Sequence, residues 1–94
     1  MKVLQNEFMD DLKEITNLSE KVNVGDKQKI FKMIKKHSEE IDELYSSGDD
    51  HWSVETADLI ILCFELLLGE KRDVDVVFEK SIPRFYKKLN DLNR

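Results

Sequence analysis

Residues 39–62 read EEIDELYSSGDDHWSVETADLIIL, and this stretch indicates two helices joined by a short polar loop. The loop, SSGDD at residues 46–50, combines small and acidic residues with a glycine, which is typical of a break between helices. Ile41 and Leu44 continue a helical apolar pattern before the loop, and the run LIIL follows it at residues 59–62. The same helical periodicity continues on both sides of this pair.

Apolar residues mark helical segments along the whole chain, separated by turn residues. The expected helices span about residues 2–21, residues 26–46, residues 50 or 53 to 68, and residues 73 onward. Asp26 is the expected N-cap of the second helix, and Gly69 is the expected residue just past the end of the third. The last segment is helical to about Ser81, and Pro83 predicts a kink or a fresh helix start there.

The composition supports an all-α fold. The 94 residues include only three glycines and one proline, and 37% are charged, well above the usual quarter. We expect one domain over residues 1–94, built as a four- to five-helix bundle-like unit. A domain this short leaves much of its surface exposed, so we also expect it to oligomerise through its helices.

The charge and the single cysteine limit the classes of function and location. A net charge of -5 excludes a general affinity for nucleic acid, which needs a basic face. The N-terminus lacks the features of a signal peptide, and the longest apolar stretch is about half the length of a membrane span. Cys63 lies in that stretch, so we expect it to be buried as a small hydrophobe in a cytoplasmic protein.

Four carboxylates stand out by their spacing. Glu40 and Glu43 are three residues apart on the second expected helix, and Glu55 and Asp58 are three apart on the third. Residues at this spacing share a helix face, so two antiparallel helices could bring the two pairs together. Clustered carboxylates repel one another, and Mg²⁺ or Mn²⁺ would relieve the repulsion. The residues alone leave a metal site and an ordinary solvated acidic surface equally open.

The two motifs in order resemble a known superfamily. EEIDEL is similar to an EExxEL element, and ETADLIIL is similar to an ExxD element followed by an apolar run; both are found in the MazG-like all-alpha NTP pyrophosphatases. This resemblance covers residues 34–68 well. It implies that the magnesium ligands are Glu40, Glu43, Glu55 and Asp58. It also implies that Glu39 and Glu43 are catalytic, Glu39 as an outer group or a base that orients water.

The resemblance further implies hydrolysis of the α–β phosphoanhydride of a nucleoside triphosphate and assembly as a dimer or tetramer. Residues expected to bind the phosphates are Lys80, Lys87, Arg94 and Lys36. Trp52 and Phe8 are candidates for stacking on the base, although such aromatic residues more often pack in a core or interface. His37 lies on the apolar face of its helix, and we interpret it as a hydrogen-bonded core histidine rather than a ligand.

Two other interpretations remain open. The run KKHSEE at residues 35–40 resembles a segment of phosphoribosyl-ATP pyrophosphatase, a member of the same superfamily. However, no histidine follows Asp58 in the apolar helix, as that enzyme would lead us to expect. The third possibility is a catalytically silent helical interaction module that retains only the fold.

Overall fold

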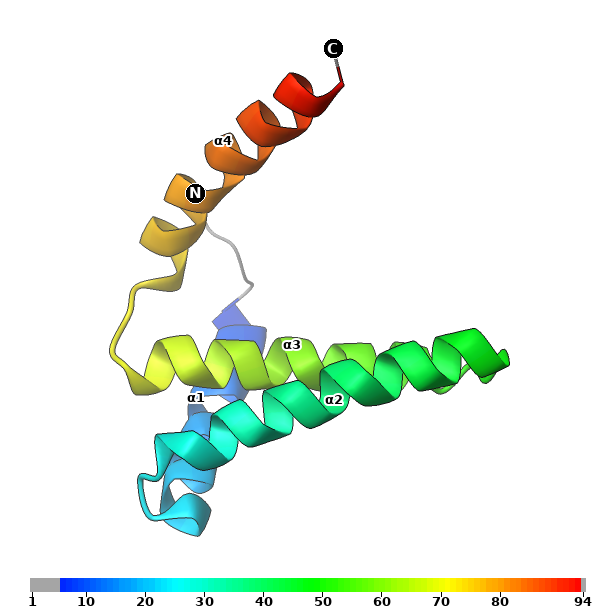
Figure 1. The fold of residues 1–94 in the computed structure, drawn as a ribbon. Coiled ribbons are helices and arrows are strands. Elements are labelled where there is room, and N and C mark those ends of the chain that lie inside the picture. Colours follow the sequence, from blue (N-terminus) through cyan, green and yellow to red (C-terminus); the bar gives the residue numbers. More distant parts are fainter. Residues whose placement is uncertain (1–5, 94) are drawn as a thin grey trace.

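The computed structural model describes residues 6–93 and confirms the all-α fold, with no strand in that range. The helices, shown in Figure 1, are α1 (Asn6–Asn23), α2 (Lys27–Ser47), α3 (Trp52–Gly69) and α4 (Val74–Leu92). Residues 2–5 of the first predicted helix, and Arg94, lie outside the described residues. The ends of the first three helices that can be compared, and the start of the fourth, were therefore predicted to within a few residues.

α2 and α3 form an antiparallel hairpin whose ends are set by local signals (Figure 1). Asp26 caps α2 as expected, since its carboxylate accepts a hydrogen bond of 3.0 Å from the backbone N–H of Gln28. At the other end, Gly48 adopts a φ of +80°, and its N–H binds the carbonyl of Tyr45 at 3.2 Å. Glycine reaches this left-handed conformation at little cost, which allows the tight turn into α3.

The end of α3 differs from the prediction. Gly69 belongs to the helix, and the residue with positive φ is Lys71, at +59°. A Cβ atom on Gly69 would lie 2.7 Å from the Nζ atom of Lys27, which pairs with Glu20 at 3.6 Å. The end of α3 therefore lies beside the Lys27 side chain at the start of α2, and the helix continues through the glycine.

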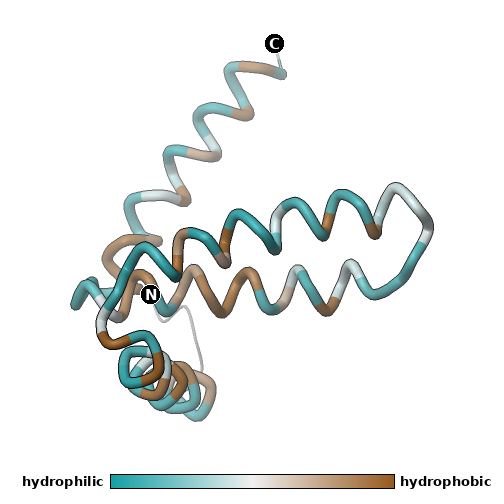
Figure 2. The backbone as a smooth tube through the Cα atoms, turned by 60° about the horizontal axis from the view of Figure 1, so that its bottom comes forward, coloured by the Kyte–Doolittle hydropathy of each residue, from teal (hydrophilic) through white to brown (hydrophobic). Residues whose placement is uncertain are grey.

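The core lies at one end of the hairpin, where α1 crosses the C-terminal part of α3 (Figure 1). Leu12 of α1, Phe64 of α3 and Val74 of α4 form its centre and are 1%, 7% and 3% exposed. Partly buried residues around them are Met9, Ile61, Leu67, Leu68 and Phe78. In Figure 2 the hydrophobic colouring is densest along α3, which agrees with its central position. The loop that begins α3 lies at the opposite end of the hairpin.

α4 is one helix from Val74 to Leu92 with Pro83 inside it, so of the predicted kink or fresh start at Pro83 the fresh start is wrong, as is the expected helix end near Ser81. Proline removes one N–H donor of the helix, and residues on both sides of Pro83 nevertheless belong to the same helix. α4 leads away from the other helices (Figure 1), and the radius of gyration is 15.4 Å. A compact domain of this length would have roughly 12 Å. The fold is therefore open on the side of α4.

The predicted burial of Cys63 is also wrong, because its side chain is exposed. α3 is apolar on nearly all sides, but α1, α2 and α4 cover only part of its circumference. Ile60, one turn earlier, is likewise 49% exposed. Partial burial by its apolar neighbours still raises the pKa of the Cys63 thiol above its usual value. Among the described helices none has the length and hydropathy of a membrane span.

Candidate metal centre

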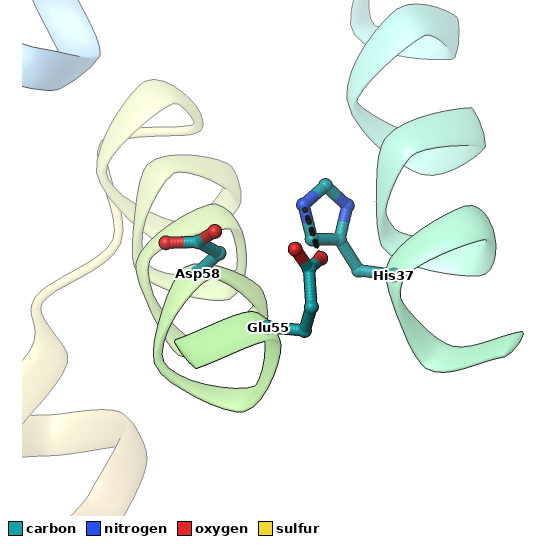
Figure 3. A group of neighbouring side chains, drawn as sticks. All are labelled: His37, Glu55 and Asp58. Atoms are coloured by element: carbon teal, nitrogen blue, oxygen red, sulfur yellow. Dashed lines mark ion pairs between the residues drawn. The ribbon is translucent and has the colours of Figure 1, made fainter. Parts of the chain in front are cut away.

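Three side chains from α2 and α3 converge near the middle of the hairpin: His37, Glu55 and Asp58 (Figure 3). Glu55 and Asp58 lie in the first two turns of α3, and their spacing of three places them on the same face, as predicted. The antiparallel α2 brings His37 beside them. One ligand atom from each residue can be chosen so that all three atoms lie within 4.8 Å of one another. No other such set occurs within residues 6–93.

Glu55 lies between the two histidines of the chain. Its Oε2 atom is 3.4 Å from Nε2 of His37, and its Oε1 atom is 3.3 Å from Nε2 of His51. The Glu55 side chain is only 15% exposed, whereas that of His51 is 56% exposed. The Oε2 atom is buried and has no hydrogen-bond partner among the described residues. A buried carboxylate oxygen without a partner is costly and indicates room for a cation.

His37 is held in a defined orientation. Its Nδ1 atom lies 2.8 Å from the carbonyl oxygen of Met33, one turn earlier on α2. A carbonyl can only accept, so Nδ1–H donates this bond, and in the neutral ring Nε2 keeps its lone pair. The expectation of a hydrogen-bonded histidine is therefore confirmed, but its free nitrogen faces the Glu55 carboxylate and not the hydrophobic core (Figure 3).

The acids of α2 lie outside this close group. Glu40 is half-buried, and its Oε1 atom is 4.0 Å from Nζ of Lys36. Glu39 and Glu43 are exposed. Glu40 follows His37 by three residues, so it occupies the same side of α2. The metal and catalytic roles of these three glutamates stay predictions.

The cations expected to bind phosphate are spread over the chain. Lys36 is 74% exposed and pairs with Glu40. Lys80 and Lys87 are exposed on α4, and Nζ of Lys87 is 2.8 Å from Asp91. α4 starts beyond the far end of α3, which is about 27 Å long. Within one chain, therefore, Lys80 and Lys87 do not gather with Glu55, and Arg94 lies outside the described residues.

The two aromatic candidates are also far apart. The Trp52 ring packs edge-on against Tyr45 across the hairpin turn, with ring centroids 5.4 Å apart and planes at 76°. This contact closes the end of the hairpin next to the metal-ligand candidates. Phe8 is 42% exposed on α1, which crosses the opposite end of α3. Of the two, only Trp52 is close in the chain and in space to Glu55.

A second acid of α3, Glu65, is buried in the fold and does not belong to the metal centre. It is 5% exposed, and its Oε2 atom has no hydrogen-bond partner among the described residues. Burial raises the pKa of the Glu65 carboxyl, and a hydrogen bond with Ser19 lowers it in part. Glu65 lies about two turns after Asp58 and contacts Ser19 of α1, so its burial bears on stability.

The donor set fits a divalent cation. Glu55 and Asp58 offer the carboxylate oxygens that Mg²⁺ and Mn²⁺ prefer, and the Glu55 Oε2 atom has no hydrogen-bond partner among the described residues. Sequence reasoning placed both acids correctly and missed His37 as a member of the group. The available signal was the spacing of His37 and Glu40, which puts an imidazole and a carboxylate on one side of α2. Comparisons of this chain with known protein families, with curated proteins and with solved structures found no match.

Proposed function

We propose that this chain is a magnesium-dependent nucleoside triphosphate pyrophosphohydrolase that works in the cytoplasm and releases a nucleoside monophosphate and pyrophosphate. The observation that supports it most is the pair Glu55 and Asp58 at the start of α3, where the buried Oε2 atom of Glu55 has no hydrogen-bond partner among the described residues. The resemblance of EEIDEL and ETADLIIL to the MazG-like motifs gives the reaction. Mn²⁺ is the expected substitute for Mg²⁺.

Each acid has a role in this proposal. Glu55 and Asp58 hold the cation from α3, and Glu40 and Glu43 complete its ligands from α2. Magnesium, when bound, neutralises the triphosphate and lowers the pKa of the attacking water. Glu39 or Glu43 accepts the proton of that water through a carboxylate oxygen as the α-phosphorus is attacked. The bond to the β-phosphate oxygen then breaks, and pyrophosphate leaves.

A second copy of the chain completes the site in this proposal. α4 carries a largely uncovered apolar surface, with Phe85, Tyr86 and Leu89 between 61% and 68% exposed. Such a surface on a helix that leads away from its own core favours pairing with another chain. Pairing would let the cationic residues of one copy reach the carboxylates of the other, which they do not approach within one chain. The assembly is then a dimer or a pair of dimers.

The test is release of pyrophosphate from a panel of nucleoside triphosphates, including dUTP and dCTP, in the presence of Mg²⁺. We expect wild type to hydrolyse at least one, and Glu55→Gln to lose at least 100-fold in rate because a metal ligand is neutralised. Asp42→Asn is the matched control, since Asp42 is an exposed acid of α2 outside the close group, and it should retain the wild-type rate. No release from any nucleotide by wild type would refute the proposal, as would equal rates for wild type and Glu55→Gln.

A further inference from the structure

We infer that His37 is itself a metal ligand, so that this site also binds divalent cations able to accept nitrogen, such as Zn²⁺ or Co²⁺, through the imidazole. The inference concerns the site on which the proposed function rests, and it adds an imidazole to a set expected to contain only carboxylates. It follows from the orientation of the ring, the separation of the ligand atoms and the charge of the group.

The first step is the orientation of the ring. Nδ1–H of His37 donates to the Met33 carbonyl at 2.8 Å, which fixes both the ring plane and the tautomer. Histidines that bind metals commonly donate their other ring N–H to a carbonyl or carboxylate in this way, and this hydrogen bond raises the basicity of the ligating nitrogen. The lone pair of His37 Nε2 is therefore oriented to bind a metal ion before the ion is present.

The second step is distance. Nε2 of His37 lies 3.4 Å from Oε2 of Glu55, too far and too poorly aligned to count as a hydrogen bond. Two ligand atoms that are each about 2.1 Å from a tetrahedral ion are separated by roughly 3.4 Å. The two atoms are thus spaced as neighbours on one ion. The Asp58 carboxylate comes from the same face of α3 and can supply a third ligand (Figure 3).

The third step is burial and charge. The Oε2 atom of Glu55 is buried without a hydrogen-bond partner, and the His37 side chain is only 22% exposed. With a neutral imidazole, the group formed by His37, Glu55 and Asp58 has two negative charges, which one divalent cation balances. The nearest lysine on this side of α2, Lys36, pairs with Glu40 instead. A divalent ion would therefore coordinate the Oε2 atom of Glu55 and also balance the two negative charges of the group.

The types of ligand atom determine which cations this site binds most tightly. Mg²⁺ prefers oxygen ligands in octahedral geometry and retains its waters. Imidazole suits Zn²⁺ and Co²⁺, and affinity for nitrogen ligands rises along the first-row series towards them. Removing the imidazole should therefore weaken Zn²⁺ and Co²⁺ far more than Mg²⁺. This selective loss separates a ligand from a residue that only supports the fold.

The first experiment measures the binding of Zn²⁺, Co²⁺ and Mg²⁺ by calorimetry, with no nucleotide present. We expect His37→Gln to weaken Zn²⁺ and Co²⁺ by at least tenfold and Mg²⁺ by less than threefold. His51→Gln is the matched control, because His51 touches the same glutamate through its other oxygen but is mostly exposed and outside the close group. Circular dichroism of each variant verifies that the helices are intact.

The second experiment observes the two imidazoles by nitrogen NMR. Wild type without metal should show His37 with a proton on Nδ1 only, and Zn²⁺ should shift its Nε2 resonance, while His51→Gln identifies the signals. Equal Zn²⁺ affinity of wild type and His37→Gln would overturn the inference, and so would an unmoved Nε2 resonance under saturating Zn²⁺. A His37 that carries protons on both nitrogens and pairs with Glu55 without binding Zn²⁺ would overturn it as well. Because no triphosphate is used, these outcomes are independent of pyrophosphate release.

Discussion

Replacing Glu65 by methionine should stabilise this protein at neutral pH. Glu65 is 5% exposed in α3, and one of its carboxylate oxygens has no hydrogen-bond partner among the described residues. A buried polar group without a partner costs about 1–3 kcal/mol, and the hydrogen bond with Ser19 returns about 1 kcal/mol. Methionine has a similar length and no charge, so the net gain is about 1 kcal/mol, or roughly 5 °C in Tm for a domain of this size.

The gain should depend on pH with a definite sign. Burial raises the pKa of Glu65 in the folded protein, so the folded state holds the proton more tightly than the unfolded chain. The stability that this proton provides to wild type is fully present below the ordinary glutamate pKa. It is lost as the pH rises through the raised, folded-state value. The advantage of Glu65→Met should therefore be greatest at neutral pH and shrink on acidification.

Urea unfolding followed by circular dichroism, at neutral pH and near the ordinary glutamate pKa, measures this difference. Glu14→Met is the control, because Glu14 is exposed on α1 and its replacement should change the free energy of unfolding by less than about 0.5 kcal/mol. A Glu65→Met protein that is no more stable than wild type at neutral pH would refute the reasoning. An advantage that is the same at both pH values would refute it too, since the cost would then not come from ionisation.

Two further substitutions test the fold. Leu12→Ala should lower the free energy of unfolding by about 3 kcal/mol, because Leu12 is 1% exposed at the centre of the core. Leu18→Ala, at a position 54% exposed on the same helix, should cost far less in the same urea titration, and equal costs would contradict the assigned core. Gly48→Ala should lower the free energy of unfolding by about 1 kcal/mol, because the residue has a φ of +80°, which alanine adopts only with strain. No steric clash adds to this cost, since nothing lies within 4 Å of an added Cβ. A thermal melt unchanged by Gly48→Ala would show that the turn relaxes without cost.

Local signals predicted the helices well wherever a residue acts on its own backbone. Asp26 and Gly48 are examples, since a carboxylate cap and a left-handed glycine depend on only a few neighbouring residues. Gly69 misled the prediction because the helix continues through it, and the residue that takes the positive φ is Lys71. A glycine near the end of a helix does not by itself fix the residue at which the helix stops.

Burial was harder to predict than helicity. The apolar run of α3 correctly indicated a central helix, but the sequence could not show how much of its surface the other helices cover. Cys63 and Ile60 lie on the part that they leave open. In α1, Leu12 is 1% exposed, whereas Phe8, one turn earlier, is 42% exposed. Periodicity identifies the apolar side of a helix, and only the packing of the other helices decides its centre.

In the candidate site, too, the sequence predicted what depends on one helix and did not predict what depends on the packing of two. The i, i+3 spacing of Glu55 and Asp58 follows from the helix alone, and both acids lie together as predicted. The approach of His37 depends on the register between α2 and α3, which the loop length and the packing of the whole hairpin decide. His37 was recognised as a hydrogen-bonded residue of the apolar face. Its contact with Glu55 is evident only in the three-dimensional structure.

The attachment of α4 has a mechanical consequence. α4 joins the core only through its first turns, where Val74 is buried and the ring of Phe78 lies 6.0 Å from that of Phe64. Along the helix axis Phe78 is about 6 Å from Val74, and Leu92 is about 27 Å from it. The helix is thus a lever, in which a shift of about 1 Å at Phe78 becomes roughly 4–5 Å at the far end. The aromatic contact between Phe78 and Phe64 therefore limits how far the C-terminal turns of α4 can move.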